Sequence, residues 1–274
     1  MSTSVTSRMP VIYLSHGGGP CFFMDWSSIG PVDTWNTMAT YLKNLHRTFP
    51  TPKAVVVISA HWEEKEFTVM SEEAPALLFD YYGFPKHTYE LSYPALGSTI
   101  VAARVMELLR AAGIQSKTET KRGFDHGVFV PFKLVYPEAN IPIVQVSMKN
   151  SMSPADHIAL GKALAPLRDE GVLIVGSGMS YHNLQDLFQG GATVLQHSQA
   201  FDRWLVETSS LTDADERNAK LEKWETAPSG RKAHPREDHL IPLMVVSGAA
   251  GNESGKQTFS DVVMGAATSA FQFG

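Results

Sequence analysis

Residues Ala54–Trp62 read AVVVISAHW, and this segment carries the clearest signal of fold class in the 274-residue chain. Its first part, Ala54–Ser59, is continuously apolar and rich in β-branched side chains, which is typical of a strand covered on both faces. Val11–Leu14, Ile141–Ser147 and Val172–Val175 have the same character and predict further buried strands. Because such strands occur in sheets flanked by helices, we expect an α/β protein.

Helical patterns separate these apolar runs and support the same fold class. We expect one domain, residues 9–274, with a central mostly parallel or mixed sheet flanked by helices, because no linker or repeat divides the chain. The polar residues 1–8 are expected to be a disordered tail. The expected helices cover residues 33–45, 98–112, Pro154–Glu170, parts of 194–224 and 240–250, and residues 257–273 are expected to add one or two closing strands.

Composition excludes several classes of function. The 23 basic and 28 acidic residues give a formal net charge of −5, and no basic run exceeds a pair, so we expect no nucleic-acid partner. Cys21 is the only cysteine, which excludes internal disulfides and cysteine-based zinc sites. The chain has no apolar stretch long enough for a bilayer and no signal-peptide pattern, so we expect a cytoplasmic protein without a membrane partner, either a monomer or a small homo-oligomer.

Three of the ten histidines follow predicted strands. His16 follows Val11–Leu14, His61 follows Ala54–Ser59, and His182 lies a few residues beyond the third run. The carboxyl ends of strands in open α/β sheets meet at one edge, where ligands bind, so these three imidazoles are expected to share a cleft. A lone histidine after a strand is more often a capping or core residue, but three in the same topological place favour a metal site.

Two further histidine clusters are less decisive on spacing alone. His126 lies in Gly123–Gly127, where a plain turn with Asp125 capping the next helix is an equally good interpretation. His234 and His239 lie in a polar segment that a solvated loop would explain as well. The remaining histidines are expected at the surface: His46, His87, His157 and His197.

The same residues also admit a serine hydrolase. His16–Gly19 matches the HGGG oxyanion loop of esterases, and Gly178-Met179-Ser180-Tyr181-His182 is the nearest candidate for their nucleophile elbow. A histidine in the last position of the elbow is a poor fit, because small residues must flank the nucleophile. Cys21 is expected to be a buried structural residue.

An ordered set of motifs resembles the LigB-type extradiol ring-cleavage dioxygenases, in the branch of 4,5-DOPA dioxygenases. The set runs from about Met9 to Gly251, so the resemblance covers nearly the whole domain. It comprises Ser15–Gly17, Val57–Trp62, Tyr82–Pro85, Tyr93–Ser98, Gly123–Gly127, Tyr136-Pro137 with Ile141–Gln145, Leu167–Gly171, Gly176–Gly178 with His182–Leu184, and His239–Leu243.

The resemblance implies a ligand set and catalytic residues. His16, His61 and His239 correspond to metal ligands, and His182 to either a fourth ligand or an acid–base catalyst. His126 corresponds to a second catalytic histidine that contacts substrate or oxygen. Relatives that cleave protocatechuate use a carboxylate where this chain has His239. An all-imidazole set suits Zn(II) as well as the Fe(II) needed for activity, and no organic cofactor is implied.

The implied reaction opens the ring of a catechol, DOPA or a related compound, with O2 to give a muconic semialdehyde. Trp62, Tyr181 and His234 are expected to contact the substrate, and Tyr82 and Phe84 are further candidates for a flat aromatic pocket. A place in the hydrophobic core would explain each of the four aromatic residues Trp62, Tyr82, Phe84 and Tyr181 equally well. Two alternatives remain open, a metal-binding protein similar to the Memo proteins without oxygenase activity, and a zinc-dependent hydrolase.

Overall fold

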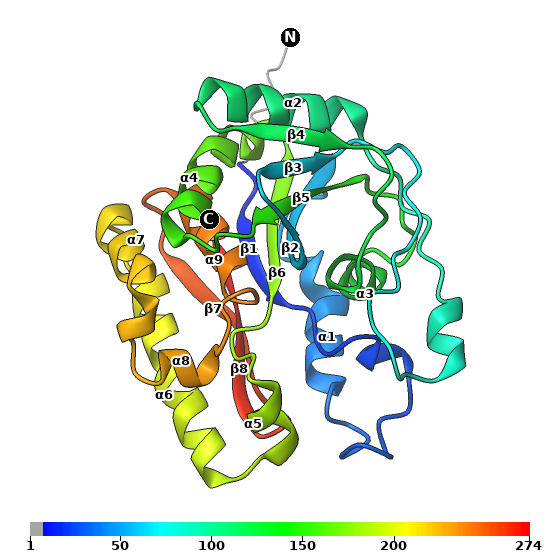
Figure 1. Cartoon of the computed structure of the whole chain (residues 1–274), viewed down its shortest axis with the longest axis vertical. Coiled ribbons are helices and arrows are strands. Elements are labelled where there is room, and N and C mark those ends of the chain that lie inside the picture. The colour runs from blue at the N-terminus through cyan, green and yellow to red at the C-terminus, as the bar shows by residue number, and fades with distance from the viewer. Residues whose placement is uncertain (1–7) are drawn as a thin grey trace.

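A mixed eight-stranded sheet forms the centre of the computed structural model, which describes residues 8–274 (Figure 1). The predicted tail therefore lies outside the described residues, except for Arg8. The strand order is β4-β3-β5-β2-β6-β1-β8-β7. The strands are β1 (Val11–Ser15), β2 (Ala54–Glu64), β3 (Phe67–Met70), β4 (Ser116–Glu119), β5 (Ile143–Lys149), β6 (Val172–Gly178), β7 (Gly255–Val263) and β8 (Ala266–Phe273).

The centre of the sheet is parallel and its flanks contain antiparallel pairs. Strands β5, β2, β6 and β1 are neighbours and run parallel, whereas β3 pairs antiparallel with β5 and β8 pairs antiparallel with β1. The predicted single α/β domain with a mixed sheet is confirmed. The polar edge strand β4 was not predicted, because neither of its faces is apolar.

Helices cover both faces of the sheet. Alternate side chains of β2 enter different clusters: Val56 and Ile58 pack into one, and Val55 and Val57 into the other. Helices α2 (Thr99–Ala111), α4 (Pro154–Leu164), α6 (Ala192–Ser209), α7 (Ala214–Glu222) and α9 (Ile241–Ala250) contribute to the first cluster. Helices α1 (Asn36–Leu45) and α3 (His126–Val135) contribute to the second. Short helices complete the chain: η1 (Cys21–Phe23), η2 (Lys86–Glu90), η3 (Ala165–Arg168), α5 (Leu184–Gln189), η4 (Trp224–Thr226) and α8 (Gly230–Ala233).

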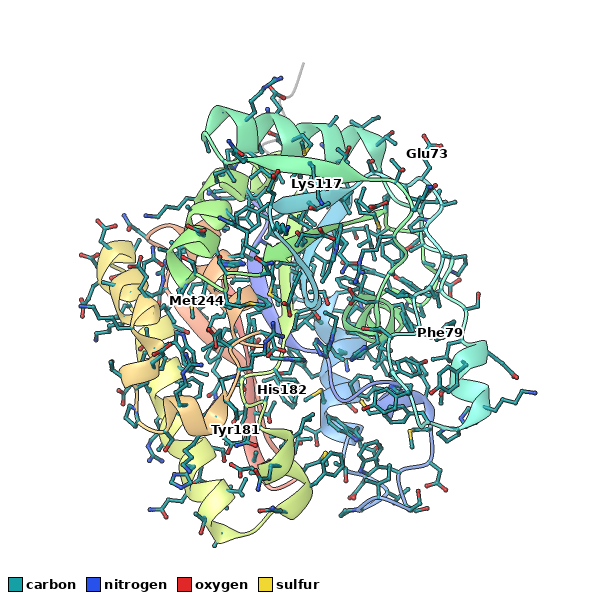
Figure 2. All side chains as sticks on the ribbon, in the orientation of Figure 1. Glu73, Phe79, Lys117, Tyr181, His182 and Met244 are labelled. Carbon is teal, nitrogen blue, oxygen red and sulfur yellow. The ribbon has the colours of Figure 1, made fainter. Side chains whose placement is uncertain are left out.

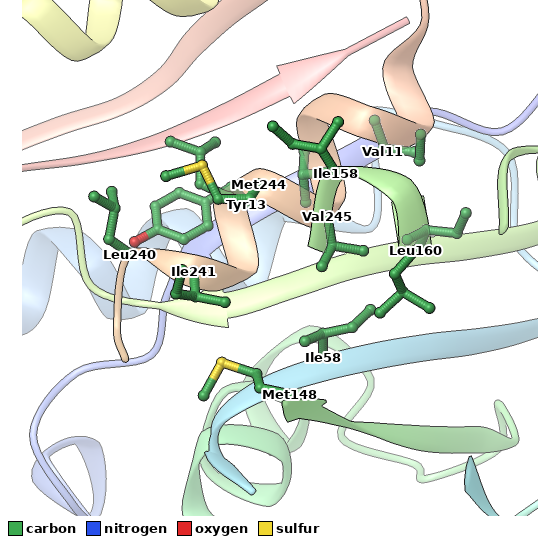
Figure 3. Packing of buried hydrophobic residues seen from close by; sticks show 14 of the residues in the cluster. Val11, Tyr13, Ile58, Met148, Ile158, Leu160, Leu240, Ile241, Met244 and Val245 are labelled. Atoms are coloured by element: carbon green, nitrogen blue, oxygen red, sulfur yellow. The ribbon is translucent and has the colours of Figure 1, made fainter. Parts of the chain in front are cut away.

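Helices α4 and α9 pack side by side, with Ile158 of α4 near Val245 of α9 in Figure 3, and a glycine of each helix lies at the contact. A Cβ atom on Gly161 would lie 2.0 Å from the main-chain oxygen of Val245, and one on Gly248 would lie 2.1 Å from that of Ile158. No side chain could occupy either position without moving the other helix. The close contact fixes the middle and the carboxyl-terminal half of α9 against α4.

Several predicted helix limits are confirmed and two are wrong. The helix expected from residue 33 begins only at Asn36, with Trp35 at the cap position. Ser98 caps α2 by accepting a hydrogen bond from the N–H of Val101, and Ser153 caps α4 in the same way. The helix predicted over Pro154–Glu170 ends at Leu164 and continues only as η3. Pro166 explains the change, because it has no N–H and its ring conflicts with a preceding helical carbonyl.

The prediction that His157 lies at the surface is wrong. Its side chain is fully buried in α4, where Nδ1 donates to the oxygen of Ser153 (2.7 Å) and Nε2 accepts from the N–H of Lys149 (3.1 Å). Burial lowers the pKa of His157 to about 4, so the ring is neutral. His87 is exposed as predicted, whereas His46 and His197 are half-buried.

None of the helices within residues 8–274 combines the length and apolar character needed to cross a membrane.

Candidate metal centre

Neighbouring strands deliver three histidines to one edge of the sheet. His16 directly follows β1, His61 lies in β2, and His182 follows β6, which runs between these two strands. The pairing of β2 with β5 shifts register between Ile58 and Glu63, so β2 carries an irregularity at His61. Such irregularities re-aim side chains next to functional sites. Figure 2 shows His182 with Tyr181 just beyond β6.

Two more histidines reach the same place from helix starts. His126 is the first residue of α3, and His239 immediately precedes the cap residue of α9. The ring centres of His126 and His16 are 5.5 Å apart, and those of His239 and His16 are 5.2 Å apart. The structure therefore gathers all five histidines singled out in the sequence for metal binding or catalysis.

Three of these rings form a nearly regular triangle. The ring centres of His16, His61 and His239 are 4.9, 4.9 and 5.2 Å apart. Imidazoles bound through nitrogen at about 2.0–2.1 Å to one tetrahedral ion have ring centres about 5 Å apart. The spacing and the donor type of this trio therefore fit a divalent transition-metal ion.

The other two rings pack against members of the triangle. The ring centres of His126 and His61 lie 3.9 Å apart with 39° between the ring planes, and those of His182 and His239 lie 3.4 Å apart with 15° between the planes. By nitrogen positions, His126 groups with His16 and His61, and His182 groups with His239 and Asp238. The five histidines therefore form two adjoining groups of donors.

Ser177 fixes the tautomer of His16. Its hydroxyl donates its single proton to the main-chain oxygen of Gly127, so it accepts at 3.0 Å from Nδ1 of His16. The proton of the ring is therefore on Nδ1, and Nε2 carries a lone pair. That Nε2 lies 3.1 Å from Nε2 of His61.

Asp80 holds His126 at two points. One carboxylate oxygen accepts from both the main-chain N–H and Nδ1 of His126, each at 2.9 Å. Its other oxygen lies 3.8 Å from Nδ1 of His61. Burial favours the neutral acid, but the hydrogen bonds from His126 and the electrostatic attraction to His126 and His61 outweigh it, so the pKa of Asp80 falls below its usual range.

Asp125 occupies the cap position of α3 without capping it, so the capping interpretation is wrong for its side chain. The fully buried carboxylate instead accepts from Ser59 (2.7 Å), Arg122 (3.0 Å) and Gln145. Arg122 also donates to the main-chain oxygen of His61. This network ties β2, β5 and the start of α3 together below the histidines.

Four histidines of the cluster are neutral near pH 7: His16, His61, His182 and His239. Burial is the largest cause in each case, and neighbouring imidazoles add to it. The pKa values of His16 and His239 lie well below the ordinary value, and that of His61 falls to about 3. The pKa of His182 is also lowered, with Asp238 opposing the effect of burial. Neutral imidazoles have free lone pairs, which is the form that binds metal ions.

Two ion pairs of Arg236 hold the loop before α9. Asp238 lies 3.1 Å from Nδ1 of His239 and accepts from its main-chain N–H. Arg236 contacts Asp238 at 3.2 Å and forms a two-point ion pair with Glu63 of β2, at 2.6 and 2.7 Å. The loop that carries His239 is thereby fastened to the strand that carries His61.

The predicted substrate contacts are mostly buried. Trp62 lies beneath the guanidinium of Arg122, and the hydroxyl of Tyr181 donates to Asp186 at 2.6 Å. Phe84 is half-buried, whereas Tyr82 is 91% exposed.

His234 has no exposed surface. Its ring packs against Phe201 and Trp224, and its Nε2 donates to the main-chain oxygen of Ser180 at 3.1 Å. These contacts show that His234 belongs to the buried core and anchors the loop before α9.

Sequence reasoning missed Asp80 and Ser177 as partners of the histidines. Ser177 lies within the Gly176–Gly178 motif, and Asp80 comes just before the Tyr82–Pro85 motif. The motifs were visible in the sequence, but nothing in their spacing connects them to His16 and His126.

Converging neutral imidazoles at the carboxyl edge of an α/β sheet define a class of protein, the non-haem metal enzymes. The comparison with known families is more specific. Residues 10–272 match the model of the catalytic LigB subunit of aromatic ring-opening dioxygenase, and the chain belongs to this family.

Individual relatives agree with that assignment. The chain is 43% identical to a 4,5-DOPA dioxygenase extradiol of Beta vulgaris over 74% of this chain and 75% of the relative. It is 38% identical to the dioxygenase tasH of Hapsidospora irregularis over 93% and 82%. A crystal structure of an uncharacterized protein from Escherichia coli K12 matches with a TM-score of 0.76 and 30% identity, over 97% of this chain and all of that one.

Proposed function

We propose that this ring-opening dioxygenase cleaves the ring of a catechol beside its two hydroxyl groups, with DOPA or a close relative as substrate. The triangle formed by His16, His61 and His239 is the observation that carries the proposal. Similarity to the 4,5-DOPA dioxygenases supports the substrate class. The carbon–carbon bond beside the diol breaks, and the two atoms of O2 end in a carboxylate and an aldehyde. No external reductant is required.

In this proposal His16, His61 and His239 hold a divalent ion. When bound, Fe(II) would supply the Lewis acidity and the electron transfer to O2 that ring opening requires, and Zn(II) would fit the same donors. Ser177 supports the assignment of His16, because its hydrogen bond leaves the Nε2 lone pair free. The neutral state of all three rings supports it as well.

His182 and His126 act on protons in this proposal. His182 is neutral near pH 7, since burial lowers its pKa, so its ring can accept a proton from a phenolic hydroxyl. His126 is held by Asp80 on the opposite side of the cluster, against His61. It would steady the reacting oxygen and return a proton to the opened ring.

The direct test is anaerobic reconstitution with Fe(II), followed by oxygen-electrode traces and absorbance scans with L-DOPA, protocatechuate and catechol. We expect O2 uptake in equal amount to a new yellow product, fastest with the DOPA-like substrate. No uptake with any catechol, despite bound metal, would refute the proposal and favour a protein without oxygenase activity or a hydrolase.

Variants separate the ligand and acid–base roles. His16→Ala and His61→Ala are expected to lose stoichiometric metal, whereas His182→Ala is expected to keep substrate binding and lose turnover. His87→Ala is the matched control, because His87 is exposed and lies outside the cluster. Full metal content in both ligand variants, or an unchanged kcat in His182→Ala, would remove those residues from the proposed roles.

A further inference from the structure

The loop before η2 contributes an acidic side chain to the histidine cluster. Asp80 lies in an irregular segment between β3 and η2, and 19% of its side chain is exposed. Its partner His126 is 46 residues further along the chain. The next residue of the loop, Tyr81, places its ring edge-on to the ring of His126, with centres 5.8 Å apart. Two adjacent loop residues therefore contact the same imidazole.

We propose that Asp80 is a positioning residue that sets the tautomer and the orientation of His126 for acid–base work. The inference rests on the proposed function for what His126 does. The hydrogen bonds that define the tautomer are independent of that function.

The geometry of Asp80 leaves one arrangement of protons. The main-chain N–H of His126 can only donate, so the oxygen of Asp80 that it contacts must be an acceptor. The same oxygen contacts Nδ1 of the ring at 2.9 Å, so Nδ1 must carry the proton. In the neutral ring the lone pair is then on Nε2, and a nitrogen of this ring lies within 4.8 Å of ligand nitrogens of His16 and His61.

The other oxygen of Asp80 extends its role to a proposed metal ligand. It lies 3.8 Å from Nδ1 of His61, whose ring lies 3.9 Å from that of His126 between centres. One carboxylate thus hydrogen-bonds one of two adjacent rings and lies within ion-pair distance of the other. Loss of the side chain would free His126 to rotate or to move its proton to Nε2, where the ring could no longer act as a base toward the cluster.

Three variants separate the positioning role of the Asp80 side chain from the effect of its charge and from the general effect of losing a carboxylate. Asp80→Ala removes both acceptors. Asp80→Asn is expected to keep the tautomer, because the main-chain N–H of His126 requires the amide oxygen, and not the amide nitrogen, at that position. Glu90→Ala is a matched control, an exposed carboxylate nearby in the chain that forms only a 3.9 Å ion pair with Lys86.

The first measurement is nitrogen-15 NMR of the histidine side chains in the metal-free protein at mildly alkaline pH, with His126→Gln to assign the signal. We expect wild type and Asp80→Asn to show the proton of His126 on Nδ1, and Asp80→Ala to show a mixture of tautomers. A wild-type ring protonated on Nε2, or an Asp80→Ala spectrum identical to wild type, would overturn the inference.

The second measurement is the kinetics of the Fe(II)-loaded enzyme at matched metal content. We expect kcat of Asp80→Ala to fall at least about tenfold with little change in KM, and Asp80→Asn and Glu90→Ala to stay within a few-fold of wild type. An unchanged kcat in Asp80→Ala, or an Asp80→Asn variant as slow as Asp80→Ala, would contradict a positioning role. If wild type consumes no O2, the proposed function fails, and the NMR result still decides the tautomer.

Discussion

The buried histidine of α4 makes this protein sensitive to acid for a reason unconnected with the metal site. His157 is neutral in the folded state, with both ring nitrogens hydrogen-bonded to main chain. Burial lowers its pKa to about 4 from an ordinary value of 6.5. Below pH 6.5 His157 binds a proton in the unfolded chain but stays neutral in the folded chain. The free energy of unfolding therefore falls as the pH falls.

The magnitude follows from the two pKa values. The difference between the folded and unfolded pKa values of His157 corresponds to a loss of about 3 kcal/mol in the free energy of unfolding below pH 4. About 2 kcal/mol of that is already lost at pH 5. Above pH 6.5 the contribution is constant. Protonation would also remove the acceptor for the N–H of Lys149, which lies at the end of β5.

The assay is urea unfolding of wild type, His157→Gln and a control, His87→Gln, at several pH values. We expect His157→Gln to be less stable than wild type by about 1–3 kcal/mol at neutral pH, because one of two buried hydrogen bonds is lost. The gap should narrow by about 2 kcal/mol at pH 5, since glutamine takes up no proton. Parallel stability curves for wild type and His157→Gln would refute the reasoning, and His87→Gln should follow wild type throughout.

Three further variants test other parts of the structure. Arg217→Met leaves four main-chain oxygens around the end of α9 without their donor and should lower the free energy of unfolding by about 3 kcal/mol or more; an unchanged urea midpoint would contradict this. Gly161→Ala places a methyl group 2.0 Å from the oxygen of Val245, so we expect a loss of about 1–3 kcal/mol in thermal unfolding, and an equal Tm would count against the tight helix contact. Ser177→Ala frees the ring of His16 and should weaken Zn(II) binding about 10–100-fold in a chelator competition, whereas an unaltered Kd would show that the hydrogen bond does not support the ligand.

The central sheet could be predicted because strands that are buried on both faces have apolar residues at nearly every position. Ala54–Ser59 and Val172–Val175 are apolar at every or nearly every position, since each side of these strands packs against helices. The meeting of His16, His61 and His182 follows from the same signal, because parallel neighbouring strands end at one edge. The polar strand β4 has no such pattern, so its pairing with β3 could not be foreseen.

The rest of the site depends on loop paths and strand pairings that local sequence does not encode. Asp80 reaches His126 across 46 residues of chain, and Ser177 reaches His16 across 161. The position of His157 on α4 is likewise decided by packing, because its neighbours in the sequence are compatible with a solvated helix face. Its burial follows from the position of β5 and from Phe67, whose ring lies 5.3 Å away.

The hydrogen bonds around the cluster show what a metal ion must displace. Ser177 keeps the proton of His16 on Nδ1, so Nε2 presents a lone pair. Nε2 of His61 lies 3.1 Å away and can donate to that lone pair, so two neutral rings satisfy both nitrogens. A metal ion bound to both Nε2 atoms requires the proton of His61 to leave Nε2. Nδ1 of the same ring lies 3.8 Å from an oxygen of Asp80, whose charge favours the proton at that position. Metal binding then needs only a change of tautomer in His61, and Asp80 stabilises the tautomer that presents Nε2 to the ion.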